Sequence, residues 1–384
     1  MNRLWLALLL AGVWPVPAAA ANFKVTLLAP AADPRLERVR IERAALGHPA
    51  GPAVDAIKVA LTEGRFELDA AGATLELTQV EVVDAAGATA AAAKAERDGA
   101  TALITDLPAT WTSAAAQGTK LPVLNVGAAA DALRQGECRR NLFHLGLSER
   151  MRSDALAQVL MARRWHNVLM LTGPSETDRE RSATAMASIK RYGLKLVASR
   201  PFKLSADPRE RDLANTLLLT QGSYDVVWVV DSEGEFALLL PYRTVLPRPV
   251  VGDAGLVAVA WSPRFERFGA PQVTRRLSKA AGRPMEAHDW PAWLAGKALV
   301  AAAVAAPKGP AAAFHKALAE VELDGSKGVV MSFRAWDGQL RQPVLLSDGR
   351  SVIDVAPLEG VLHPKNALDT LGADAPEKLC KARP

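Results

Sequence analysis

Residues 138–174 read CRRNLFHLGLSERMRSDALAQVLMARRWHNVLMLTGP and predict a strand end, a turn, a long helix and a second strand. The apolar run Leu142–Gly146 stops at a glycine, and Ser148 follows as the expected N-cap of the helix. From Met151 to Trp165 apolar residues recur at helical spacing. Val168–Leu171 is apolar throughout, which is typical of a strand buried in a parallel sheet. We interpret this segment as the passage from one α/β lobe into a second.

Short apolar strands alternate with helical segments on both sides of this passage. The predicted strands are 23–28, 74–83, 102–104, 122–126, 194–202, 226–230 and 250–251. The predicted helices are 38–46, 53–63, 87–99, 127–133, 176–192, 208–221, 233–240, 263–281 and 290–306. Strands 328–333, 342–346 and 351–355 are expected to be antiparallel, with turns at Asp-Gly pairs. The alternation predicts an α/β fold with doubly wound, Rossmann-like parallel sheets.

Several segments resemble the type I periplasmic binding proteins, the leucine/isoleucine/valine-binding class. More narrowly, they resemble the ABC-transporter substrate-binding proteins of alcohol dehydrogenase systems that use pyrroloquinoline quinone (PQQ). The similarity covers most of the chain and rests on residues 138–145, 153–160 with 163–165, 239–243 (LLPYR), 247–256, 336–343 (WDGQLRQP) and 360–371. It implies two lobes that are joined by a multi-crossover hinge and close on a ligand.

The expected domain limits follow from this resemblance and from the alternation of elements. The first lobe is predicted at 21–146 plus about 263–327, and the second at 147–262 plus about 328–356. Residues 357–384 are expected to form a tail near the hinge.

The first twenty residues predict export. Met1–Ala20 combines a basic start at Arg3, a short apolar run and small residues at its end, as in a cleaved signal peptide. The periplasm is therefore the expected location. The formal charge is +5, with 46 basic and 41 acidic residues spread along 384 positions. This balance offers no basic stripe for nucleic acid.

The two cysteines, Cys138 and Cys380, permit one disulfide in an exported protein. Such a bond would tie the C-terminal tail beside the hinge; two free buried thiols are the alternative. The chain contains no zinc-ligand pattern, so no metal site is predicted.

No catalytic motif is present in the sequence. The nucleophile elbow, the paired-histidine zinc motif, the dinucleotide fingerprint and the phosphate-binding loop are all missing. We therefore expect a binding protein without a catalytic cofactor, not an enzyme.

Ligands of open parallel sheets bind beyond the carboxyl ends of the strands, where helices begin. This rule, with the LLPYR segment, selects the candidate ligand-binding residues Asp106, Leu107, Trp111, Gly127, Ala128, Glu176, Asp231, Glu233, Arg243, Asp253 and Trp261. For Asp106, Asp231 and Glu233 the alternative is helix capping, and for Arg243 a surface or hinge salt bridge. Trp111 and Trp261 follow strand ends and are the candidates for stacking on a ligand.

The resemblance implies a small-molecule ligand, a membrane permease as partner and a monomeric chain. PQQ, an aromatic polyanion, is the first ligand hypothesis. An amino acid or small organic acid is the alternative, as is a sensor linked to alcohol oxidation.

Overall fold

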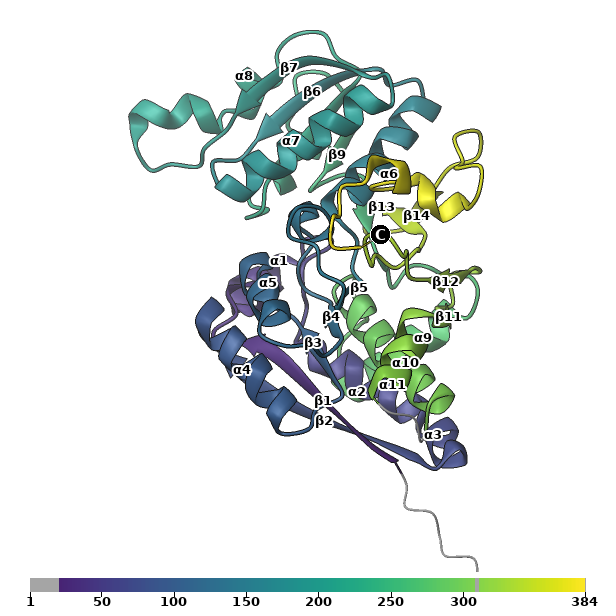
Figure 1. The fold of residues 1–384 in the computed structure, drawn as a ribbon. Helices are drawn as coiled ribbons and strands as arrows, with labels where there is room; N and C mark the ends of the chain where they lie inside the picture. The colour runs from purple at the N-terminus through teal and green to yellow at the C-terminus, as the bar shows by residue number, and fades with distance from the viewer. Residues whose placement is uncertain (1–20, 308–310, 384) are drawn as a thin grey trace, which may run out of the picture.

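The computed structural model describes residues 21–307 and 311–383, so the predicted signal segment lies outside the described residues. The first lobe is built on a five-stranded parallel sheet in the order β2-β1-β3-β4-β5 (Figure 1). Its strands are β1 (Ala21–Pro30), β2 (Ala73–Val82), β3 (Ala102–Thr105), β4 (Val123–Asn125) and β5 (Leu142–His144). Its helices are α1 (Arg38–Arg43), α2 (Ala53–Glu63), α3 (Arg65–Ala71), α4 (Ala85–Arg97) and α5 (Ala109–Gln117).

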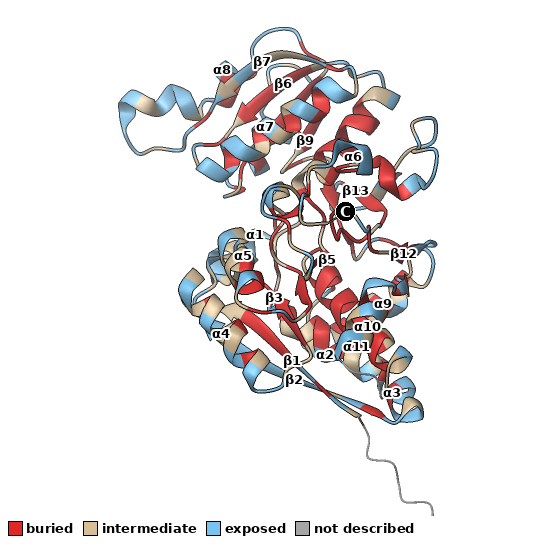
Figure 2. Cartoon of the chain, viewed as in Figure 1, coloured by how far each residue is buried: buried red, intermediate tan, exposed pale blue. Residues whose placement is uncertain are grey.

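The second lobe is built on a four-stranded parallel sheet in the order β7-β6-β8-β9. Its strands are β6 (Asn167–Thr172), β7 (Lys195–Pro201), β8 (Val226–Val230) and β9 (Val250–Gly252). Its helices are α6 (Glu149–Ala162), α7 (Glu176–Arg191) and the short α8 (Thr216–Leu219). All five residues of β8 are buried, as is most of the neighbouring β6 (Figure 2), because helices cover parallel strands on both faces. The predicted α/β class with two doubly wound lobes is confirmed.

Three later helices follow the second sheet: α9 (Ala270–Ala281), α10 (Asp289–Ala305) and α11 (Ala311–Ala319). Helix α10 packs against α2 and α3 of the first lobe, and α9 also contacts α2. Helix α10 is apolar nearly all round and mostly buried, which is typical of a helix inside a core. After forming the second sheet, the chain therefore returns to the first lobe and completes its core.

The antiparallel strands form two small sheets. One has the order β10-β13-β14, from β10 (Val257–Val259), β13 (Val344–Ser347) and β14 (Val352–Ala356), and it packs against α6. The other pairs β11 (Glu322–Asp324) with β12 (Val330–Ser332). The predicted antiparallel strands near 328–355 are confirmed.

Four helix predictions are wrong or start too early. The predicted helix 233–240 is a 3₁₀ segment, Ala237–Tyr242, and the predicted helix 263–281 is helical only from Ala270. Residues 127–130 form a loop, and only Asp131–Arg134 makes a 3₁₀ turn. The Asn125 side chain bonds to the backbone of this loop, since its Oδ1 accepts from the Ala128 amide at 2.9 Å. Residues 208–221 contain a 3₁₀ segment, Pro208–Ala214, and then α8, which Asn215 caps separately.

The chain passes between the lobes along neighbouring segments, and Gln342 joins them. Its Nε2 donates to the Leu145 carbonyl oxygen at 2.7 Å, and its Oε1 accepts from Trp290 Nε1 at 2.8 Å. Gln342 is completely buried, so its side chain replaces water for both partners. This one amide therefore ties the segment after β5 and the start of α10 to the segment that leads into β13.

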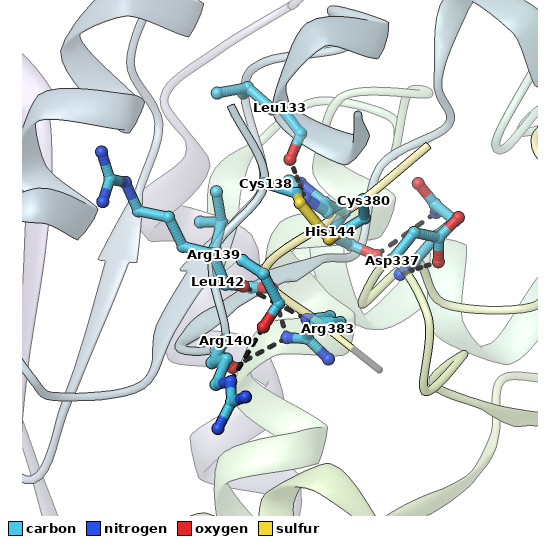
Figure 3. Close-up of a disulfide and its surroundings, with 11 residues drawn as sticks. Leu133, Cys138, Arg139, Arg140, Leu142, His144, Asp337, Cys380 and Arg383 are labelled. Atoms are coloured by element: carbon cyan, nitrogen blue, oxygen red, sulfur yellow. Dashed lines mark hydrogen bonds between the residues drawn. A yellow bond between two sulfur atoms is a disulfide. The ribbon is translucent and has the colours of Figure 1, made fainter. Parts of the chain in front are cut away.

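The C-terminal tail is fastened beside β5 by a disulfide between Cys138 and Cys380, 242 positions apart (Figure 3). Arg383 adds hydrogen bonds to the carbonyl oxygens of Arg139, Arg140 and Leu142, at 3.2, 3.0 and 2.8 Å. Among the described residues, no helix combines the length and the hydrophobicity needed to span a bilayer.

Candidate functional site

A cavity of about 290 Å³ lies between the two lobes. The first lobe lines it with the loop after β1, the loop after β4 and the start of α10. The second lobe lines it with α6, α7 and the ends of β8 and β9. The carboxyl ends of both parallel sheets thus face one enclosed space, which is where such sheets bind ligands.

The charged groups of the cavity are four arginines and two carboxylates, namely Arg35, Arg40, Arg152, Arg181, Glu149 and Asp253. The lining therefore carries a formal excess of two positive charges before partners outside the cavity are considered. Asp33 and Asp106 pair with Arg35, and Glu233 pairs with Arg40. Among the described residues, Arg152 is therefore the lining arginine that remains available to attract an anionic ligand.

Arg35 is oriented from behind by Asp106. Its Nη2 donates to Asp106 Oδ1 at 2.9 Å, and its Nε and Nη2 also donate to the Asp33 carboxylate. His288 Nε2 lies 3.0 Å from Asp106 Oδ2. Burial alone would raise the pKa of Asp106, but His288 and Arg35 hold it well below its usual range. Asp106 is thus an ionised anchor that presents Arg35 and His288 to the cavity.

Arg181 pairs with both carboxylates of the lining. Its Nη1 and Nη2 donate to Asp253 at 2.9 and 2.6 Å, and its Nε donates to Glu149 at 3.1 Å. Asp253 also accepts from the Asp231 amide at 2.7 Å. Burial would raise the pKa of Glu149, yet Arg181 and Arg152 lower it. Glu149 is therefore ionised, and it shares the Arg181 guanidinium with Asp253.

The remaining walls are largely apolar. Trp228 on β8 reaches the cavity although it is otherwise buried, and Leu46, Pro49, Leu156, Val257 and Pro291 complete the surface. His48 also lines the cavity. Burial lowers the pKa of His48, and nearby arginines lower it further against the opposing effect of Asp253. A neutral imidazole there supplies one donor and one acceptor.

Three of the residues predicted from sequence line the cavity: Gly127, Ala128 and Asp253. Asp106 stands behind the lining and holds two of its members, and it does not cap α5, whose N-cap is Pro108. Asp231 caps locally, since its side chain accepts from the Glu233 and Ala237 amides at 3.1 and 2.9 Å.

The other predicted residues lie elsewhere. Leu107 is buried in the core between the first sheet and its helices, and Trp111 packs partly buried against the same core. Trp261 is 1% exposed and stacks on Trp290, with ring centroids 4.5 Å apart, so it is a core residue and not a ligand platform. Glu176 and Arg243 are exposed outside the cavity.

Sequence reasoning missed most of the charged lining. Arg35 and Arg40 come from the loop and short helix after β1, while Arg152 and Arg181 lie inside α6 and α7. The helical spacing of apolar residues had marked these helices only as packing elements. The signal available in the sequence was that each of these helices carries an arginine directly beside a buried position.

Ion pairs join the lobes at the mouth of the cavity. Arg40 pairs with Glu233, and Arg43 Nη2 pairs with Glu235 at 2.7 Å. Both glutamates are more than half exposed, so each pair contributes little singly and is weakened by salt. We call this group of four residues the mouth pairs.

Replacing both mouth glutamates, Glu233→Gln with Glu235→Gln, should shift the free protein toward a more open arrangement of the lobes. The expected loss is about 0.5–2 kcal/mol for the two pairs together. Small-angle scattering should give a larger radius of gyration for the double variant in dilute buffer, and the wild type should approach it at high salt. Glu42→Gln is the matched control, because Glu42 pairs with Arg38 within α1. Identical scattering for the wild type and the double variant would contradict the prediction.

No protein-family model and no curated protein matches the chain. Solved structures do. A solute-binding protein of an ABC transporter from R. palustris, in complex with benzoate, aligns with a TM-score of 0.65 over 87% of this chain and 96% of its own, at 16% identity. A branched-chain amino acid transporter substrate-binding protein from Streptococcus pneumoniae, in complex with isoleucine, gives 0.64 over 87% and 98%, at 14% identity. A periplasmic binding protein from Burkholderia mallei gives 0.67 over 95% and 100%, at 12% identity. The chain has the type I periplasmic binding protein fold.

Proposed function

We propose that this protein is the periplasmic solute-binding component of an ABC transporter and that it captures a small carboxylate-bearing solute between its lobes. The supporting observation is the cavity at the facing carboxyl ends of two parallel sheets, lined by four arginines and two carboxylates. The partners implied are a small molecule and a membrane permease. Binding, not chemistry, is the task that this arrangement serves.

The fold neighbours support a carboxylate ligand in two forms. Two R. palustris proteins are described with benzoate and with 3,4-dihydroxybenzoic acid, and others with isoleucine and leucine. Organic acids and amino acids are therefore both candidates for this chain. Each carries a carboxylate that an arginine of the lining could bind.

PQQ is the narrower ligand that the sequence resemblance implies. Its stacking partners were expected to be Trp111 and Trp261, and neither lines the cavity. Trp228 is the aromatic side chain that does. PQQ therefore belongs in the panel of probes, beside simpler acids.

The test is to release and identify small molecules from the protein purified from its own periplasm, and then to titrate candidates. Carboxylates that bind should raise the melting temperature, because a ligand at 100 times its Kd adds about 2.7 kcal/mol. They should also quench tryptophan fluorescence through Trp228. Trp228→Phe should remove that quenching and Trp111→Phe should keep it. Binding of uncharged sugars, or of no carboxylate among acids, amino acids and PQQ, would overturn the proposal.

A further inference from the structure

Arg152 differs from the other cavity arginines in having no protein partner. Arg35 pairs with Asp33 and Asp106, Arg40 with Glu233, and Arg181 with Glu149 and Asp253. Within the described ranges, the Arg152 side chain makes no hydrogen bond and no ion pair, and its Nε is buried without an acceptor. A buried donor left unsatisfied is costly, and a charged one more so.

The place of Arg152 explains why no protein acceptor reaches it. Arg152 lies in the first turns of α6, directly after the first crossing, and partly buried. Glu149, one turn earlier on the same helix, turns to Arg181 instead, at 3.1 Å. The Arg152 guanidinium is left directed at the cavity, opposite the loop at Gly47 and His48.

The cavity offers no equivalent anchor for an ammonium group. The ammonium that an amino acid carries needs a carboxylate that is not already bound to an arginine, and both acids of the lining accept from Arg181. Both oxygens of Asp253 already accept charge-assisted bonds, and one also accepts the Asp231 amide. An ammonium would have to compete with Arg181 for these oxygens and would also lose its own hydration.

We infer that Arg152 binds the carboxylate of the solute and that the cavity selects organic acids without an amine over α-amino acids. This inference rests on the proposed function and narrows it. Arg152 offers the fork of donors that suits a carboxylate in two parallel bonds. The hydrocarbon or aromatic body of the acid lies against Trp228, Leu156 and Pro49. Neutral His48 can add a hydrogen bond at the rim.

The test compares matched probes by calorimetry: 4-methylpentanoate, its amide and leucine, and then benzoate and benzamide. The wild type should bind at least one of the two acids, at least tenfold more tightly than the matching amide, and 4-methylpentanoate more tightly than leucine. Arg152→Gln should weaken binding of that acid by about 10- to 100-fold and erase the preference over the amide. Arg152→Lys should keep part of the affinity for the acid, since the lysine ammonium keeps the positive charge but lacks the planar fork of donors. Arg163→Gln, the same change at the end of α6 and outside the cavity, should leave binding unaltered.

Unfolding of the ligand-free variants gives an independent readout. If Arg152 serves the solute, the ligand-free Arg152→Gln variant should be nearly as stable as the wild type, because it loses no hydrogen bond or ion pair of the side chain within the described residues. A large loss of stability would mark Arg152 as structural and overturn the inference. So would acid binding that is unchanged by Arg152→Gln, or leucine binding as tight as that of 4-methylpentanoate. A wild type that binds neither the acids nor leucine, nor any other carboxylate, would overturn the proposed function itself.

Discussion

A variant without the disulfide, Cys138→Ala with Cys380→Ala, should melt on the order of 10 °C below the wild type. The bond closes a loop of 242 residues, and in the chain-entropy model such a loop adds on the order of 4–5 kcal/mol to the free energy of unfolding. Each kcal/mol corresponds to roughly 2–4 °C in a domain of ordinary size. Differential scanning calorimetry of the variant, and of the reduced wild type, measures the shift.

A control separates the covalent bond from the contacts around it. Arg383→Gln keeps both cysteines but removes the guanidinium that donates to the Arg139, Arg140 and Leu142 carbonyl oxygens (Figure 3). It should cost less than loss of the disulfide, because other donors and water can replace solvent-facing bonds. A fully reduced wild type, verified by thiol counting, that melts at the same temperature as the oxidised protein would refute the prediction.

The second large effect is expected at Asp106. Asp106→Ala should lower the free energy of unfolding by about 3–5 kcal/mol, because it removes one partner of a buried charged group and leaves Arg35 and His288 without their shared acceptor. Binding in the cavity should weaken as well, since both residues line it. Asp33→Ala is the matched control: Asp33 also pairs with Arg35 but does not reach His288, so it should cost clearly less.

The contribution of Asp106 should depend on pH in a definite direction. The folded protein holds the pKa of Asp106 well below that of the unfolded chain, so the unfolded state takes up the proton first as the solution is acidified. The stabilisation is complete above about pH 4–5 and is lost as the pH falls through and below the ordinary aspartate pKa of about 3.9. Chemical denaturation from pH 7 to 3 should show the wild type and Asp106→Asn converging in acid. A stability difference that stays constant over this range would argue against an ionised Asp106.

Local sequence was sufficient where one element's own residues decide its structure. Helix α6 begins after Ser148, whose hydroxyl accepts from the Met151 amide at 3.1 Å, and β8 spans Val226–Val230 as the unbroken apolar run predicts. The prediction failed at 127–133, where a side chain from the preceding strand, Asn125, satisfies backbone groups that a helix would otherwise have paired.

The tryptophans show where local reasoning ends. Both Trp228 and Trp261 are almost completely buried, yet Trp228 forms a wall of the cavity and Trp261 stacks in the core on Trp290. Nothing in the neighbouring residues separates these outcomes, because the partner that covers Trp261 lies on α10, a later helix of the first lobe. We expected Trp261 to stack on a ligand because it follows a strand. In the structure, Trp290 of the later helix α10 covers it instead.

By itself the sequence determined the two α/β lobes and the strand ends at which a ligand would bind, because strand burial and helix capping depend on short-range pattern. Gly127, Ala128 and Asp253 were found in that way. Only the tertiary structure decided which charges are available to a solute. Arg152 and Arg181 have the same side chain on successive helices, and they differ because the packing of α7 beside α6 and β9 within the second lobe gives Arg181 two carboxylates and gives Arg152 none.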